Sequence, residues 1–199
     1  MKRVKLKVMG ISYSQTQSGA YALILVDETG DRRIPIIIGG FEAQAIVIKL
    51  ENLDPPRPLT HDLFKNFADE FDITVSEVMI YKLEEGVFFS KLVCSNGKKE
   101  FSIDSRTSDA VALSLRFGCP IFTSEEILEK SGITINPAET DIETNADVSE
   151  IIEPQSGKYS SYNDEELYKL IDEAVKTEDY ERAAAVRDEI EKRKKKKKK

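Results

Sequence analysis

The stretch KLVCSNGKKEFSIDSRTSDAVALSLRFG, residues 91–118, contains the order of elements on which the fold depends. CSNGK has the composition of a tight hairpin turn, and it separates two predicted strands, 87–94 and 99–104. From residue 107 apolar residues recur at intervals of three and four, which is typical of a helix packed on one side. The stretch therefore predicts a β-hairpin that leads directly into a helix over 107–118.

The same order occurs earlier in the chain, because a shift of 67 positions aligns residues 6–53 with 73–120 without a gap. Gly30 then matches Gly97 at a predicted turn, where a positive φ favours glycine. The predicted elements are strands over 2–13, 20–27, 32–38 and 73–83, a helix over 41–52, and short helices that begin at 60–64 and 124–128. We therefore predict an α+β fold in which duplicated β-β-β-α units form two half-sheets of one curled mixed sheet, flanked by helices.

Composition divides the chain into a folded domain and three further segments. These are the domain 1–133, an acidic linker 134–162, a helical hairpin 163–193 and a lysine tail 194–199. The domain has 16 Lys+Arg against 19 Asp+Glu, so it has no overall positive charge with which to attract nucleic acid. The basic run 192–199 predicts only a solvated tail with a nonspecific attraction for phosphate.

The remaining composition is that of a globular protein, with 40% hydrophobic residues. No apolar run is long enough to span a bilayer, and MKRVKLKVMG (1–10) predicts a strand rather than a signal peptide, so we expect a cytoplasmic protein without membrane contact. Cys94 and Cys119 are too few to predict a disulfide framework or a zinc site. No phosphate-binding glycine loop or nucleophile-elbow motif is present.

Three stretches carry a resemblance to a known family: GGFEAQAI (39–46), RPLTHDL (57–63) and SRTSDAVALSLRFGCPI (105–121). Their residues, order and spacing resemble the motifs of the bifunctional nuclease domain family, over about residues 1–133. Members of this family are described as acting on both DNA and RNA. The resemblance therefore implies a nuclease whose partner is nucleic acid.

The duplication gives a physical reason to group the charged residues of these motifs. Glu42 and Asp109 occupy equivalent positions in the first turns of equivalent helices, so both carboxylates are expected to face one groove. Two carboxylates there could act in catalysis and hold Mg²⁺ or Mn²⁺, which would activate water.

Four further residues lie in the loops and first turns at the same helix ends. His61, the only histidine, could act as a general acid or base, with Asp62 beside it as a second catalytic candidate. Arg57 and Arg106 could bind phosphate through paired hydrogen bonds.

The same residues also fit a purely structural interpretation. Thr60 is a favourable N-cap, and the dipole of the following helix would stabilise Asp62. Glu42 and Asp109 could have the same electrostatic role, with Arg106 as an ion-pair partner. The aromatic residues Tyr81, Phe88 and Phe89 are interpreted as core residues rather than as a platform for stacked bases.

Residues 163–193, NDEELYKLIDEAVKTEDYERAAAVRDEIEKR, predict two helices separated by KTED, the first with Asn163 and Glu166 as a capping pair. EDYERAAAVRDEI (178–190) resembles the UVR motif of UvrB and UvrC, a helical hairpin that contacts other proteins, often a second copy of itself. The resemblance implies another UVR-containing protein or a homodimer as partner. The candidate partner-binding residues are Leu167, Ile171, Tyr180, Ala184, Arg187 and Ile190.

Three hypotheses for function follow, the third of which is an enzyme that acts on a small molecule. The first is a metal-assisted nuclease for DNA, RNA or both, which the family resemblance favours. The second is a binding or regulatory adaptor without catalysis, which the acidic balance of residues 1–133 and the hairpin favour.

Overall fold

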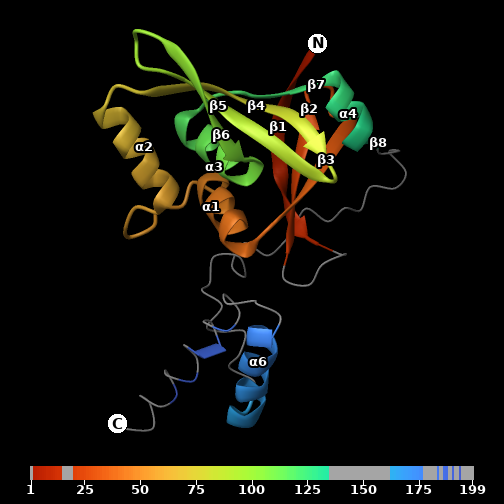
Figure 1. Cartoon of the computed structure of the whole chain (residues 1–199), viewed down its shortest axis with the longest axis vertical. Helices are drawn as coiled ribbons and strands as arrows, with labels where there is room; N and C mark the ends of the chain where they lie inside the picture. The colour runs from red at the N-terminus through yellow and green to blue at the C-terminus, as the bar shows by residue number, and fades with distance from the viewer. Residues whose placement is uncertain are drawn as a thin grey trace. The chain divides into compact units, whose positions relative to one another are not determined.

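The computed structural model describes residues 2–14, 20–134 and 162–176, together with five later positions: Ala183, Val186, Arg187, Ile190 and Arg193. The chain forms two compact units, Met1–Ile151 and Ile152–Lys199 (Figure 1). Nearly all of the predicted linker 134–162, and the whole of the predicted tail 194–199, lie outside the described residues.

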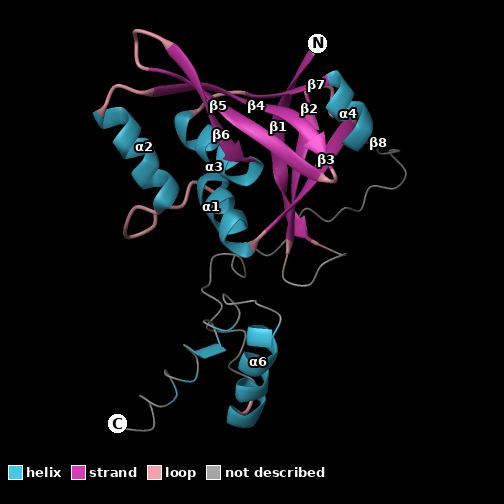
Figure 2. Cartoon of the chain, in the orientation of Figure 1, coloured by secondary structure: helices cyan, strands magenta, loops and turns pink. Residues whose placement is uncertain are grey.

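Within the described residues the first unit has one eight-stranded mixed sheet, in the order β6-β5-β4-β7-β1-β2-β3-β8. The strands are β1 (Arg3–Tyr13), β2 (Tyr21–Asp27), β3 (Arg32–Ile38), β4 (Thr74–Glu84), β5 (Val87–Ser95), β6 (Glu100–Arg106), β7 (Ile121–Ser124) and β8 (Ile133–Thr134). Helices separate and follow the two groups of three strands (Figure 2). The α+β class and the curled mixed sheet predicted from the sequence are confirmed.

The sheet has the predicted internal repeat. The antiparallel meanders β1-β2-β3 and β4-β5-β6 run outward in opposite directions from the middle of the sheet. The helix α1 (Gly40–Leu50) follows the first meander and α3 (Thr107–Phe117) follows the second, and the 67-residue shift superposes their bounds. α1 and α3 pack against each other, α1 on β1 and β2 and α3 on β4, β5 and β6 (Figure 1).

β7 joins the two meanders, and the sequence analysis did not predict it. Its residues pair antiparallel with β1 and parallel with β4, so the two half-sheets become one continuous sheet. α4 (Glu125–Ser131) follows at once, with Ser124 as N-cap, and packs on β3, β4 and β7. Since β3 and β4 lie far apart in the strand order, these contacts show that the sheet curls around α4.

The core lies between the sheet and the helices. Its largest fully buried side chains in the first unit are Leu23, Leu25, Ile34, Ile46, Ile80, Leu92 and Leu128. They come from both repeats and from α4, so all three contribute to the core. Burial of a side chain of this size contributes about 1.5–3 kcal/mol, and this burial fixes the position of the helix starts on the sheet.

α2 (Thr60–Glu70) lies between the repeats in sequence and packs on α3. Its N-cap is Leu59, so the prediction of Thr60 as N-cap is wrong. The carboxylate of Asp62 instead accepts a hydrogen bond from the backbone N–H of Leu59, at 2.9 Å. This bond satisfies a donor that the first helical turn leaves without an intrahelical partner.

The second unit contains α6 (Asp164–Lys176) and the isolated described positions that follow it. The predicted capping pair is confirmed: Asn163 N donates to Glu166 Oε2 at 2.8 Å, and Glu166 N donates to Asn163 Oδ1 at 2.9 Å. Leu167, Val186 and Ile190 form a buried cluster with Leu170 and Ile171 packed against it. No helix among the described residues of the chain is long and apolar enough to cross a membrane.

The matched glycines of the two repeats are predicted to be required for the same reason, a positive φ at equivalent turns. Gly30 has φ +84° and Gly97 has φ +78°, and a Cβ added at either position would meet nothing within 4 Å. Gly30→Ala and Gly97→Ala should therefore each lower the free energy of unfolding by about 1–2 kcal/mol, through backbone strain alone. Urea unfolding measures this, with Lys98→Ala as a control in the same turn, and an unchanged midpoint in both glycine variants would contradict the inference.

Candidate active site

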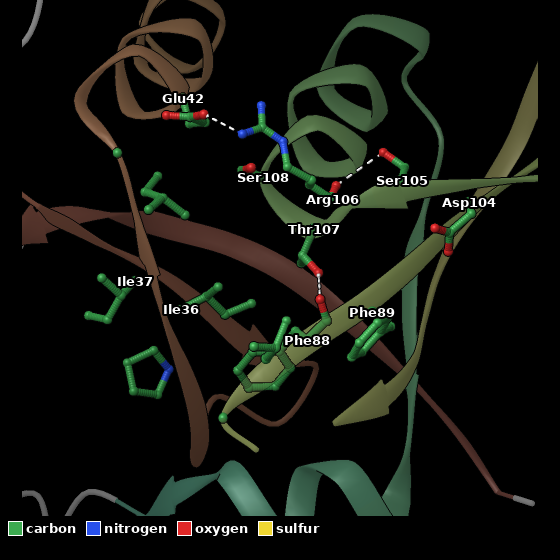
Figure 3. A pocket seen from close by; sticks show the side chains of 15 residues that line it. Ile36, Ile37, Glu42, Phe88, Phe89, Asp104, Ser105, Arg106, Thr107 and Ser108 are labelled. Atoms are coloured by element: carbon green, nitrogen blue, oxygen red, sulfur yellow. Dashed lines mark hydrogen bonds and ion pairs between the residues drawn. The ribbon is translucent and has the colours of Figure 1, made fainter. Parts of the chain in front are cut away.

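The first turns of α1 and α3 come together at one exposed arginine (Figure 3). Arg106, the last residue of β6 and the N-cap of α3, donates from Nε to Asp109 Oδ2 at 2.8 Å. Its Nη1 lies 2.8 Å from Glu42 Oε1, so one guanidinium bridges the two equivalent carboxylates. The prediction that Glu42 and Asp109 share a groove is therefore consistent with this geometry.

Glu42 has its position because the residue before α1 is a glycine. A Cβ added at Gly39 would lie 2.5 Å from Glu42 Oε2, so a larger residue there would displace the carboxylate. The absence of a side chain lets the carboxylate fold back over the helix start, toward Arg106.

His61 completes the cluster from the first turn of α2. Its Nε2 lies 3.1 Å from Asp109 Oδ1, and its side chain is 16% exposed. Asp109 therefore interacts with His61 through Oδ1 and with Arg106 mainly through Oδ2. A carboxylate that contacts one ring nitrogen orients the imidazole and determines its tautomer.

The charges of the cluster are mutually stabilised. Burial by itself would raise the pKa of Asp109, but hydrogen bonds with Arg106 and His61 outweigh burial and hold that pKa below its ordinary value. The hydrogen bond with Asp109 raises the pKa of Arg106. Asp109 is consequently ionised and Arg106 positively charged throughout the neutral pH range.

Asp62 has a different partner from Asp109, although it is the neighbour of His61. Arg116 donates from Nε to Asp62 Oδ1 at 2.6 Å, and its Nη1 donates to the carbonyls of Ala45 and Ala112, each at 3.0 Å. The Arg116 side chain is 3% exposed. Burial would raise the pKa of Asp62, but the hydrogen bonds from Arg116 and from the Leu59 backbone lower it. This geometry favours the structural interpretation of Asp62.

Arg116 was not among the residues predicted from the sequence. A signal was available, since this cation interrupts the apolar face of the helix 107–118 and must have an acidic partner if buried. The partner lies 54 positions away along the chain, which no helical spacing reveals.

Cavities separate the predicted site residues into two groups. One cavity of about 500 Å³ has Glu42, His61, Arg106 and Asp109 in its lining. Arg57 instead lines a cavity of about 240 Å³ beside Asp62 and Arg116. The structure thus brings together four of the six predicted residues, and the candidate site is defined from here on as Glu42, His61, Arg106 and Asp109.

The arrangement of the candidate site does not fit a divalent cation. The guanidinium of Arg106 occupies the position between Glu42 and Asp109 in which a cation would bind both carboxylates. In the part of the chain that the structure describes, no group of three or more His, Cys, Asp and Glu side chains could hold a metal ion. Mg²⁺ or Mn²⁺ at these carboxylates stays a prediction that requires Arg106 to move.

A second cavity, of about 490 Å³, also has Glu42 and Arg106 in its lining and extends to Phe88 and Phe89. These two aromatic residues are only half-buried, and Tyr81 is exposed. The interpretation of the three as core residues is therefore wrong. Phe88 and Phe89 lie beside an opening in the fold rather than in its interior.

Of the predicted partner-binding residues, Leu167 and Ile190 are buried in the second unit and Ile171 packs against them. Arg187 is exposed. Tyr180 and Ala184 lie outside the described residues. Their role in partner binding stays a prediction.

Comparison with known proteins gives two family matches. The model of the bifunctional nuclease domain matches residues 23–136, and the model of the UvrB/uvrC motif matches residues 165–196. An uncharacterized protein of Mycobacterium tuberculosis is 38% identical over 146 residues, which cover 73% of this chain and 86% of that protein. Proteins named bifunctional nuclease 1 in Oryza sativa subsp. japonica and bifunctional nuclease in Oryza minuta are each 25% identical over 119 residues, 58% of this chain and 36% of theirs.

The lowered pKa values of Asp62 and Asp109 predict an acid-sensitive contribution to stability. A carboxyl group with a lowered folded-state pKa contributes stability above its unfolded pKa, about 3.9, and this contribution is lost as the pH falls through that value toward the folded pKa. The unfolding free energy of the wild type should therefore fall from pH 5 to pH 3 more steeply than that of Asp62→Asn or Asp109→Asn. Urea unfolding at half-unit pH intervals measures the slopes, and parallel slopes in all three proteins would contradict the prediction.

Proposed function

Because this chain belongs to the bifunctional nuclease domain family, we propose that it hydrolyses phosphodiester bonds of DNA, RNA or both at the candidate site. The observation that carries the proposal is the contact of one aspartate, Asp109, with both the histidine and the exposed arginine. The names of the Oryza relatives support the same activity.

Arg106 would bind the phosphate. Its side chain is 68% exposed, although Nε and Nη2 contact Asp109 and Nη1 contacts Glu42, so part of the guanidinium faces solvent. Arginine binds phosphate oxygens through paired N–H groups and neutralises the charge that develops on them during displacement. Glu42 would hold Arg106 in place from the side opposite Asp109.

His61 would transfer the proton. When Nε2 carries its hydrogen toward Asp109, the lone pair of the imidazole lies on Nδ1. Nδ1 then takes a proton from the water that attacks phosphorus, and the carboxylate of Asp109 stabilises the imidazolium. The bond from phosphorus to the sugar oxygen breaks, and the imidazolium returns the proton to that oxygen.

The test is cleavage of single-stranded DNA and RNA by the full chain. His61→Ala should lower the rate by about 10²–10⁴-fold, because it removes general acid–base catalysis. Arg106→Ala should lower it by at least about 10²-fold, because it removes a preorganised cation from the transition state. Arg3→Ala removes another exposed arginine with an acidic partner, Glu77, and should leave the rate unchanged.

A chelator and added Mg²⁺ or Mn²⁺ form the second arm of this experiment. Cleavage that persists in chelator supports the side-chain chemistry, and cleavage that requires the ion supports a metal at Glu42 and Asp109 after Arg106 has moved. Equal cleavage by the wild type and both site variants would indicate a contaminating nuclease and refute the site.

A second proposed function is recruitment of a protein partner through the C-terminal unit, which the UvrB/uvrC motif match favours. Leu167, Val186 and Ile190 fill the interior of this unit, so its partner must bind exposed side chains such as that of Arg187. A second copy of the chain or another UVR-containing protein is the proposed partner.

Self-association of the full chain tests this second proposal by sedimentation equilibrium. Arg187→Glu should weaken association, because it reverses the charge of an exposed side chain. Leu167→Ala should weaken it together with helicity, because truncation of a buried leucine costs about 2–5 kcal/mol. Association that is indifferent to both variants would exclude the unit as the self-association site.

A further inference from the structure

The cavity of about 490 Å³, called the apolar cavity below, shares the Glu42–Arg106 ion pair with the cavity that His61 lines, but His61 is not in its own lining (Figure 3). Its lining comes from β3, from the start of β5, and from the junction of β6 with α3. β3 and β5 are separated by four strands in the sheet order, so the curl of the sheet creates this cavity. Its volume lies in the range typical of small-molecule sites.

The wall of the apolar cavity is aliphatic and aromatic. Ile36 on β3 and Phe88 on β5 lie between the two strands, and Val87 beside Phe88 is 57% exposed (Figure 3). Phe88 is half-buried, although its carbonyl is fixed by a hydrogen bond from Thr107 Oγ1 at 3.0 Å. Thr107 also lies 2.7 Å from the hydroxyl of the buried Ser90, so the aromatic wall is tied rigidly to the start of α3.

The apolar cavity has three charged residues in its lining: Arg106, its ion-pair partner Glu42, and Asp104. Arg106 and Glu42 are the only residues that line both this cavity and the cavity of about 500 Å³ that His61 lines. A ligand that fills the apolar cavity and contacts Arg106 must therefore be flat or apolar at one end and anionic at the other. A nucleotide has this distribution, with a planar base and a phosphate joined through one sugar.

We propose that the apolar cavity binds an unpaired nucleobase, so that the substrate is single-stranded nucleic acid or a single-stranded region within a duplex. The inference rests on the proposed function, because it places the scissile phosphate at Arg106 and His61. Stacking on an aromatic ring is the common means by which proteins bind unpaired bases without reading their sequence. A paired base is excluded, since its faces and hydrogen-bonding edge are occupied within the duplex. An apolar peptide side chain would fit the walls but would bring no phosphate to the exposed N–H groups of Arg106.

The test measures binding of a nucleoside 5′-monophosphate and of ribose 5-phosphate to the full chain by calorimetry. The two probes share a phosphate and a sugar and differ in the base. The wild type should bind the nucleotide about tenfold more tightly, as expected for one stacked base. Phe88→Ala should reduce this ratio to about one with unchanged affinity for ribose 5-phosphate, and Phe88→Leu, which keeps apolar volume, should give an intermediate ratio.

Phe67→Ala is the matched control, because it removes another phenylalanine, 59% exposed, that lies on α2 outside both cavities. It should keep the full ratio. Equal affinity of the wild type for the two probes would overturn the proposal, and so would a full ratio in both Phe88 variants with native circular dichroism.

Cleavage of single-stranded and duplex substrates by the same proteins separates this inference from the proposed function. Cleavage without a preference for the nucleotide over ribose 5-phosphate would refute the base site and leave the nuclease. A tenfold preference without cleavage of either substrate would refute the nuclease and retain a nucleotide-binding cavity.

Discussion

The arrangement of the helices depends on the hydrogen bonds that the buried guanidinium of Arg116 donates. Arg116 extends from α3 to the carbonyl of Ala45 on α1 and to the carboxylate of Asp62 on α2, so one side chain joins all three. Asp62 in turn binds the backbone N–H of Leu59, where α2 begins. An unpaired charge at this depth would be strongly unfavourable. Partners from the three helices pair its Nε and Nη1, whereas Nη2 is buried without a hydrogen-bond partner among the described residues. His61, the neighbour of Asp62, reaches Asp109 because of this arrangement.

Arg106, the N-cap of α3, and Arg116, near the end of α3, thus have opposite roles with similar partners. Arg116 is buried and satisfies carbonyls and one carboxylate, whereas Arg106 is exposed and bridges two carboxylates at the surface. The ion pair of Arg116 with Asp62 fixes the positions of the helix backbones. Arg106, although paired with Glu42 and Asp109, has further N–H groups that can bind a ligand. Glu42 and Asp109 come to Arg106 from equivalent positions of the repeats, so the duplication that built the sheet also supplied both acidic walls of the site.

The sequence predicted the two repeats well, because strand and helix patterns and the turn glycines are local signals. It did not predict β7, since Ile121–Ser124 is too short to show a period and its pairing is with strands far away in sequence. Four residues that the duplication and the family's motifs had grouped line one cavity, and their role in catalysis stays a prediction. The separation of Arg57 and Asp62 from that group, and the half-exposure of Phe88, depend on how the sheet curls and how Arg116 is paired. Neither is encoded by spacing along the chain.

The central position of β7 has a consequence for how the chain folds during its synthesis on the ribosome. The first meander is complete by residue 38, yet the edge of β1 that faces the middle of the sheet has no neighbour until residues 121–124 have been made. An open edge of this kind can pair with other chains while synthesis continues. Alternate lysines and an arginine along β1, at Arg3, Lys5 and Lys7, place charge on the edge during that interval. The charges on β1 thus protect the nascent chain against aggregation until β7, which follows the second repeat, pairs with β1 and β4.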